Sequence, residues 1–261
     1  MSMTKPITND SNLITIASGK GGVGKTWLST SLSQALARRN KKVALFDGDL
    51  GMANIDIQIG LMPNDDIGSV ISGDKKLSEV ITRYNEPGGK TGFDVLAGKS
   101  GSGALGSLSR DVLRSLRTQL INFAAGYDHL LLDMAAGIDP SVTTLSHHGG
   151  RIFVVMTADP TSLTDAYAFI KVTHMRNPKA RISVIVNNVP SKKDGERVFE
   201  AIKRACEGFL KISPKLAAII KTDSKVQDTI RTQTPLFSRH PQSEAANTVM
   251  MLADQIITNR L

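Results

Sequence analysis

The chain of 261 residues contains a single cysteine, Cys206, so it cannot form an intramolecular disulfide. It lacks any apolar run close to the roughly 20 residues that a membrane-spanning helix needs. Its first residues, Met1–Asn12, are polar and do not provide the apolar segment of a signal peptide. Cys206 falls in the apolar pattern of a predicted helix, Lys193–Lys211, which indicates a buried, inert thiol. These absences favour a cytoplasmic protein.

Aromatic residues are also scarce, at 5% of the chain, and they are not interleaved with basic residues as stacking platforms for nucleic-acid bases would be. The net charge of +8 is uneven: residues 1–159 hold 16 Lys and Arg against 15 Asp and Glu, and residues 160–261 hold 16 against 9. A basic half can attract nucleic acid, anionic lipid or an acidic protein. Non-specific DNA binding and contact with a membrane surface are therefore left open, without being the favoured interpretation.

Residues 19–26 read Gly-Lys-Gly-Gly-Val-Gly-Lys-Thr and fit the phosphate-loop pattern GxxxxGK[ST]. Glycines let successive backbone N–H groups turn inward around a polyphosphate, beside the positive end of the following helix. Lys25 can reach the β- and γ-phosphates, and the Thr26 hydroxyl can ligate Mg²⁺. The flanks fit, because Leu13–Ala17 reads as a strand and Trp27–Arg39 as a helix. We expect nucleotide contacts from Gly19, Lys20, Gly21, Gly22, Val23, Gly24, Lys25, Thr26 and Trp27.

Carboxylates follow two other predicted strands. Asp47 and Asp49 come at the end of the second strand, and Asp133 follows the run Leu130–Leu132. Carboxylates beside a phosphate loop are suited to holding Mg²⁺ through water and to polarising an attacking water. The sequence therefore predicts a metal site made by Thr26, Asp49 and Asp133, and catalytic roles for Lys25, Asp47 and Asp49.

The identity of the base can also be argued. A guanine site would need an Asn-Lys-x-Asp segment at the end of a late strand, but the chain has Asn187-Asn188-Val189-Pro190 there. The amide of Asn187 offers both a donor and an acceptor, as an adenine edge requires. ATP is therefore favoured over GTP.

Apolar runs of strand length alternate with helical patterns along the whole chain. Such alternation predicts one α/β domain with a mostly parallel sheet covered by helices on both faces, and a ligand site at the carboxyl ends of the strands. We expect residues 13–261 to form this domain, residues 1–12 to be a short flexible segment, and Ala97–Ser107 to be a mobile loop. The further predicted strands are Val43–Asp47, Phe93–Leu96, His129–Asp133, Arg151–Thr157, Arg181–Asn187 and Ala217–Ile220, and the further helices include Ser109–Ala125, Ser162–Arg176 and Lys193–Lys211.

The segment KGGVGKT, with Lys20 directly after Gly19, resembles the deviant Walker A ATPases of the MinD and ParA group. The resemblance implies a P-loop NTPase fold and a homodimer that ATP assembles and hydrolysis dissolves. In that group the lysine at this position reaches across the dimer to the partner's phosphates, so the resemblance adds Lys20 to the expected catalytic set. The resemblance also implies that Asp49 positions the hydrolytic water with help from Asp47. The segment Met134–Ile138, after Asp133, would sense the γ-phosphate.

Within this group the chain is similar to the flagellar-number regulators, the FleN/FlhG MinD-like ATPases. The similarity covers about Leu13 to Ile257 and implies regulation of flagellar number, placement or gene expression through protein partners of flagellar assembly or transcription control. It is carried by residues 48–56, 96–101, 108–110 and 133–138 and by the tail from 223 to 246.

Three features depart from that branch. The family commonly has a proline before the acid near Asp223, a candidate nucleotide contact, where this chain has Lys221-Thr222. The N-terminal extension lacks the Asp-Gln motif through which some members stimulate a partner GTPase. No basic membrane-targeting tail follows the last predicted helix, Ser243–Asn259, whose apolar face we expect to pack into the core.

Other functions of the same group are weighed against this one. The basic second half supports the main alternative, a ParA-like ATPase that coats DNA non-specifically for partition or positioning. An electron-transferring iron protein needs cysteines at the dimer seam, and the chain has only Cys206. A bacterial tyrosine kinase would have a tyrosine-rich tail, whereas the last tyrosine here is Tyr167.

Overall fold

The computed structural model describes residues 10–89, 91–98 and 108–261, and its centre is an eight-stranded sheet. The strands are β1 (Leu13–Ser18), β2 (Val43–Gly48), β3 (Ile81–Asn85), β4 (Gly92–Leu96), β5 (His129–Ala136), β6 (Arg151–Met156), β7 (Arg181–Val189) and β8 (Lys215–Lys221). Their order is β3-β4-β2-β5-β1-β6-β7-β8, and all neighbours are parallel except β3 and β4. The predicted mostly parallel sheet is confirmed.

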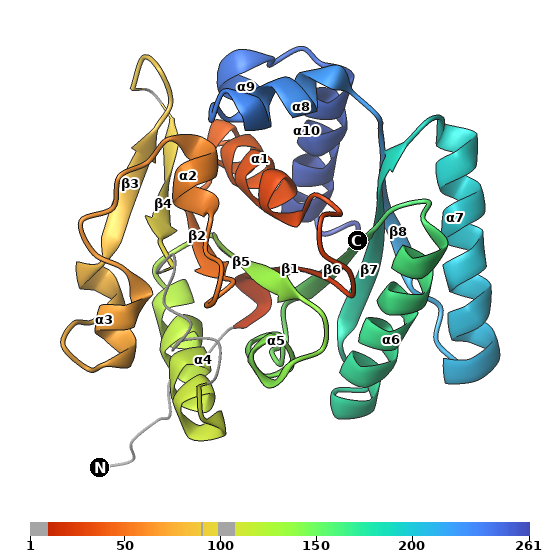
Figure 1. The fold of residues 1–261 in the computed structure, drawn as a ribbon, viewed down its shortest axis with the longest axis horizontal. Helices are drawn as coiled ribbons and strands as arrows, with labels where there is room; N and C mark the ends of the chain where they lie inside the picture. The colour runs from red at the N-terminus through yellow and green to blue at the C-terminus, as the bar shows by residue number, and fades with distance from the viewer. Residues whose placement is uncertain (1–9, 90, 99–107) are drawn as a thin grey trace.

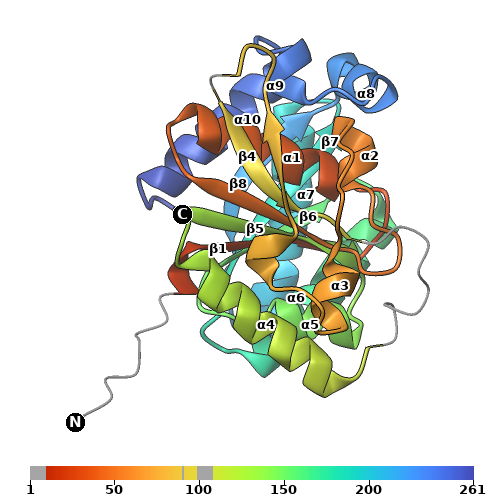
Figure 2. The same ribbon diagram turned by 90° about the vertical axis from the view of Figure 1, so that its left-hand side faces the viewer.

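Helices cover both faces of this sheet, as Figures 1 and 2 show. One face carries α1 (Lys25–Arg38), α2 (Ile55–Ile59), α8 (Ser224–Arg231), α9 (Leu236–Arg239) and α10 (Glu244–Ile257). The other face carries α3 (Ile67–Ile71), α4 (Arg110–Ala124), α5 (Pro140–Leu145), α6 (Pro160–Arg176) and α7 (Lys192–Ala205). The described residues also form the short helices η1 (Asp10–Asn12), η2 (Leu77–Glu79) and η4 (Cys206–Leu210). The predicted single-domain α/β fold is confirmed.

The side chains of β1 show why the strands read as continuous apolar runs. Leu13 and Ala17 join the hydrophobic core below α4 to α7, whereas Ile14 and Ile16 join the core below α1, α9 and α10. Because successive residues of a strand point to opposite faces, a sheet covered on both faces buries every position of its central strands. Each of the strands β1, β2 and β6 has six residues, and all of them are buried.

The bounds of the predicted elements are matched closely in most cases, but three differences stand out, one of which is that β5 continues to Ala136, past its predicted end at Asp133. The predicted helix Lys193–Lys211 ends as an α-helix at Ala205 and continues as the π-helix η4. The edge strand β3 was not predicted, although it pairs antiparallel with β4 across a turn that contains Gly88 and Gly89, both at positive φ. Its β-branched and aromatic residues before Pro-Gly-Gly are a hairpin signal.

Two expectations about burial are confirmed. Cys206 is fully buried at the start of η4, and this burial raises the pKa of its thiol to about 11, which makes it unreactive. The last helix packs into the core, because α10 buries Ala245, Val249, Leu252, Ala253 and Ile256. None of the helices that the structure describes is both long and apolar enough to cross a membrane.

Two other expectations concern residues outside the described ranges. The proposed flexible segment 1–12 includes residues 1–9, and the proposed mobile loop Ala97–Ser107 includes residues 99–107. The described strands nevertheless fix the place of the site, because the parallel strands all end at the same edge of the sheet. The loops after β1, β2, β5 and β6 gather there.

His129, at the start of β5, makes stability depend on pH. Burial lowers the pKa of this imidazole to about 4. The charge of Asp128 opposes this shift, and the charges of Lys41 and Arg151 add to it. The unfolded chain takes up the proton near its ordinary pKa of about 6.5, so stability is lost as pH falls from about 6.5 towards 4. Over this range we expect the free energy of unfolding to fall by about 1–3 kcal/mol less in His129→Gln than in the parent. Urea unfolding of both proteins at pH 7 and pH 5 checks this. Equal losses in the two proteins would contradict it.

Candidate nucleotide-binding site

The loop between β1 and α1 has the shape that a phosphate cradle needs. Gly22 and Gly24 adopt φ values of 75° and 92°, in the left-handed region that favours glycine. Gly24 is the N-cap of α1, so the loop leads directly into the positive end of that helix. A Cβ on Gly19 would lie 2.1 Å from the backbone oxygen of Asp165 in α6, so only glycine fits where the loop leaves the strand.

Lys25, the first residue of α1, is buried against this loop. Its Nζ donates a hydrogen bond to Ser18 Oγ at 2.9 Å. Burial lowers the pKa of Lys25, and the carboxylates of Asp133 and Asp49 oppose that shift. A buried cation of this kind is stabilised by any anion that enters the loop.

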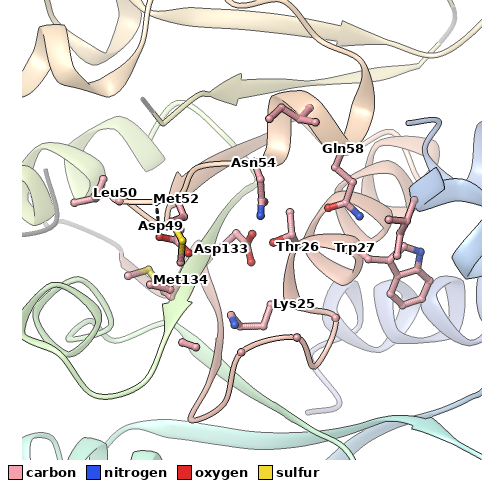
Figure 3. Close-up of a pocket in the computed structure, with 18 of the residues that line it drawn as sticks. Lys25, Thr26, Trp27, Asp49, Leu50, Met52, Asn54, Gln58, Asp133 and Met134 are labelled. Carbon is pink, nitrogen blue, oxygen red and sulfur yellow. Dashed lines mark hydrogen bonds between the residues drawn. The ribbon is translucent and has the colours of Figure 1, made fainter. Parts of the chain in front are cut away.

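Lys25, Thr26, Asp49 and Asp133 line one cavity of about 780 Å³. Figure 3 shows Lys25, Thr26 and Asp133 pointing towards this space, with Asp49 beside it. Lys25 and Thr26 come from α1, Asp49 follows β2, and Asp133 belongs to β5, so three neighbouring elements supply the group. The structure thus brings together the three predicted metal ligands and the phosphate-loop lysine.

Asp133 lies inside β5, which continues to Ala136, and not at the strand end that the sequence predicted. Its carboxylate is 2% exposed and accepts a hydrogen bond from Ser29 Oγ at 3.0 Å. Burial raises its pKa to about 6, against the opposing influence of the Thr26 hydroxyl and Lys25. The predicted switch segment therefore begins within β5, and Gly137, at φ 99°, follows the strand.

Asp47 does not line the cavity. Its carboxylate is buried in the turn after β2, where it accepts backbone N–H groups of Asp49, Asn54 and Ile55 at 3.0–3.2 Å. Burial, and then the charge of Asp133, raise its pKa to about 7. These contacts shape the segment that carries Asp49, and the catalytic role suggested by the sequence stays a prediction.

The two residues assigned to the base and ribose are held by other contacts. The Asn187 amide, 8% exposed, donates to the backbone oxygen of Val23 at 2.8 Å and so braces the phosphate loop. Asp223 caps α8 through the Lys225 N–H and accepts the Ala245 N–H at the start of α10. Neither residue lines the large cavity. A contact of Asn187 or Asp223 with a nucleotide remains a prediction.

Lys20 lies on the other side of the loop, away from the large cavity. Its Nζ forms an ion pair with Asp159 Oδ2 at 2.7 Å and donates to Thr161 Oγ1 at 2.5 Å. Asp159 caps α6, and its contacts with Lys20 and Thr161 hold the pKa of its carboxyl well below the usual range. The sequence did not identify these partners, although Asp159-Pro160 before a helical pattern is an N-cap signal.

The cavity extends from the phosphate loop towards an apolar wall. Its apolar members are Trp27 of α1, Ile57 of α2 and Ile230 of α8, and the polar Gln58 and Gln233 line the cavity beside them. The Trp27 side chain is 3% exposed, and its indole N–H is buried with no hydrogen-bond partner in the structure. Because it is the only tryptophan of the chain, its fluorescence reports on this cavity.

Comparison with known proteins agrees with this geometry. Residues 14–236 match the family described as the CobQ/CobB/MinD/ParA nucleotide binding domain. The chain belongs to this family. The matched range contains the phosphate loop, both acidic segments and Asn187, and all the residues that line the cavity described above lie within it.

Individual relatives of this family cover almost the whole chain. The antiactivator FleN of Pseudomonas aeruginosa is 30% identical over 94% of this chain and 85% of its own length. The flagellum site-determining protein YlxH of Helicobacter pylori is 29% identical over 95% of this chain and 83% of its own length. Among solved structures, the septum site-determining protein MinD of Pyrococcus horikoshii, complexed with Mg-ADP, has a TM-score of 0.78 at 23% identity and covers 96% and 97% of the two chains.

The donor set around the cavity suits Mg²⁺. Two carboxylates and one hydroxyl are hard oxygen ligands, and Mg²⁺ is commonly held by one or two carboxylates together with waters and substrate phosphates. The described residues contain no cluster of three or more His, Cys, Asp or Glu side chains, such as an all-protein metal cage would need. The residues present therefore fit a metal ion that arrives with the nucleotide.

Asp47 supplies a test of its observed role. Asp47→Ala removes the acceptor of three backbone N–H groups, so we expect a loss of roughly 2–4 kcal/mol in the free energy of unfolding. Asp47→Asn retains one oxygen and should lose less. Denaturant unfolding measures both losses. If Asp47→Ala kept parental stability and lost only catalytic turnover, its carboxylate would act in the reaction and not in shaping the turn.

Proposed function

We propose that the chain is an ATP-dependent switch that binds ATP with Mg²⁺, hydrolyses it slowly and dimerises while ATP is bound. In this proposal it acts in the cytoplasm on flagellar number, flagellar placement or flagellar gene expression, through protein partners. The observation that carries the nucleotide part is the convergence of Lys25, Thr26, Asp49 and Asp133 on one cavity at the N-terminus of α1. The relative YlxH, named as a flagellum site-determining protein, supports the flagellar part of the proposal, and the relative FleN, named as an antiactivator, supports a regulatory role.

Each residue of the cavity has a task in this proposal. The loop N–H groups and Lys25 would bind the phosphates, and Thr26 and Asp133 would hold the metal ion. Mg²⁺, when bound, neutralises charge on the phosphate oxygens. Asp49 is half-buried at the edge of the cavity, where its carboxylate would orient the attacking water. Slow turnover, below the common enzyme median of about 10 s⁻¹, suits a switch.

Lys20 would couple the nucleotide to dimerisation. Reaching a partner's phosphates requires it to leave Asp159, with which it pairs in the single chain. The side chains of both residues are well exposed, at 36% and 45%, and exposed ion pairs contribute only about 0–1 kcal/mol. A contact between Lys20 and a phosphate, shielded from water, would be stronger than an exposed ion pair. Lys20 would therefore leave Asp159 readily for a phosphate of the partner subunit.

Lys25 and Asp49 should affect the reaction differently. Lys25→Ala removes a charged contact to the phosphates, so ATP affinity should fall by about 10- to 100-fold. Asp49→Ala should bind ATP nearly as the parent does and turn it over at least about 10²-fold more slowly. Calorimetric titration and single-turnover assays separate these effects. If Asp49→Ala hydrolysed ATP at the parental rate, Asp49 could not be the residue that orients the attacking water.

Lys20→Ala should bind ATP but fail to dimerise, because the backbone loop and Lys25 already hold the phosphates of their own subunit. The matched variant Asp159→Asn frees Lys20 and should dimerise at least as well as the parent. Both are best compared in the Asp49→Ala background, by sedimentation velocity in ATP and in ADP. A Lys20→Ala protein that dimerised on ATP like its parent would refute the role of Lys20 between subunits.

The basic second half keeps a ParA-like function as the second candidate. Such a protein would be retained on DNA of any sequence only when ATP is bound, and retention would fall steeply with salt. The Asp49→Ala protein, held in its ATP state, is the form to test. Retention on DNA that is independent of nucleotide would argue against this alternative.

A further inference from the structure

The π-helix η4 turns one phenylalanine outward. Ile202 and Cys206 are fully buried on one face of α7 and its extension, four residues apart, as an α-helix repeats. In a regular α-helix Phe209 would be the next residue on that face. A π-helix has more residues per turn, so the next residue on the buried face is Leu210, which packs against the core. Phe209 is left 80% exposed.

A second apolar side chain lies exposed near the same end of the molecule. The Phe209 ring meets Tyr167 of α6 edge-on, at a centroid distance of 6.4 Å. Met175, in the last turn of α6, is 70% exposed. Because α6 and α7 pack side by side and run in the same direction (Figure 1), their ends lie at one edge of the molecule, where β7 and β8 begin. Among the described residues, Phe209 is the only aromatic member of the set of exposed large hydrophobic side chains.

This edge also carries most of the excess positive charge in the second half of the chain. Residues 171–179 and 203–215, which we call the basic edge, hold seven basic residues and one acidic residue, whereas the rest of residues 160–261 holds nine and eight. The basic residues are Lys171, Arg176, Lys179, Lys203, Arg204, Lys211 and Lys215, and all but Lys203 are exposed. Within the described part of the chain, none of the seven forms an ion pair with another side chain.

Exposed apolar side chains among unpaired cations match the chemistry of an anionic lipid surface. Lysine and arginine side chains are attracted to anionic headgroups, and an aromatic ring can enter the boundary between headgroups and acyl chains. A DNA duplex offers the same sign of charge, but its outer surface of phosphates and sugars does not bury a phenylalanine side chain. Phe209 therefore favours lipid over nucleic acid as the partner of the basic edge.

We propose that the basic edge docks on a membrane surface that contains anionic lipid, with Phe209 inserted among the headgroups. The last helix is not available for this role, because α10 packs its apolar face into the core. The nucleotide cavity lies at the other end of α6, where the cap residue Asp159 pairs with Lys20 of the phosphate loop. Docking through the basic edge would leave that cavity open to nucleotide and to a second subunit.

Sedimentation of the full chain with vesicles tests the role of Phe209. Vesicles of phosphatidylglycerol and phosphatidylcholine are compared with vesicles of phosphatidylcholine alone. We expect the parent to bind the anionic vesicles only, and about 0.5 M NaCl to release it. Phe209→Ser should bind about 10-fold more weakly, the order of factor that burying a phenylalanine side chain supports. The control Met251→Ser removes an exposed apolar side chain from α10 and should bind as the parent does.

A second pair of variants tests the charges. Arg204→Gln/Lys215→Gln removes two cations from the basic edge and should weaken binding to anionic vesicles at least about 5-fold. The control Lys192→Gln/Lys193→Gln removes the same charge from the first turn of α7. Its effect should stay below about twofold, because that end of the helix lies roughly 20 Å from the basic edge, beyond the Debye length. Equal thermal midpoints show that the variants remain folded.

Phe209→Trp keeps a large aromatic side chain and should bind as the parent does. Its fluorescence should shift to shorter wavelength on anionic vesicles, against the background of the buried Trp27. A parent that does not bind anionic vesicles would overturn the proposal, and so would equal binding by Phe209→Ser. Binding of a DNA duplex that depends on Arg204 and Lys215 but not on Phe209, without vesicle binding, would assign the basic edge to nucleic acid instead.

Discussion

The burial of α1 is the constraint on which the rest of the structure depends. Twelve of its fourteen residues are buried between the sheet and α10, including several that are polar. Ser29 donates to Asp133, and Gln34 both donates to Ser238 and accepts the Phe237 N–H, so these polar groups tie the helix to β5 and α9. The N-terminus of α1 is thereby held over the carboxyl ends of β1, β2 and β5. A phosphate cradle needs this fixed position, because its donors must stay unpaired until the ligand arrives.

The charges in the cavity make the site incomplete without its ligand. Burial raises the pKa of Asp133 and lowers that of Lys25, so each group is held in a place that disfavours its charged form. A metal ion offsets the first penalty and a phosphate offsets the second. Nucleotide and metal are therefore expected to bind together and to stabilise the fold.

The sequence predicts the parts of this site that depend on local pattern. The loop 19–26 and its flanking strand and helix are encoded by contiguous residues, and so are the strand β2 that precedes Asp49 and the strand β5 that contains Asp133. The contacts of Lys20 with Asp159 and Thr161 could not be predicted, because they join residues about 140 positions apart through the docking of α6 beside the loop. The direction of the Asp47 carboxylate likewise depends on the turn that folds over it, whose N–H groups it accepts. The sequence pattern of an aspartate at a strand end is the same whether its carboxylate faces a ligand or the backbone. The edge strand β3 was missed although a local hairpin signal precedes Pro-Gly-Gly, because the prediction relied on the alternation of strands and helices, in which two consecutive strands have no place.

The central claim is that the cavity at the N-terminus of α1 is an ATP site completed by Mg²⁺, and calorimetric titration of the full chain tests it most directly. We expect one ATP to bind per chain, ATP to bind more weakly when Mg²⁺ is removed, and GTP to bind at least about tenfold more weakly than ATP, equivalent to about 1.4 kcal/mol. Quenching or enhancement of Trp27 fluorescence should follow the same binding curve. Absence of ATP binding, or equal affinity for ATP in the parent and in Lys25→Ala, would contradict the account.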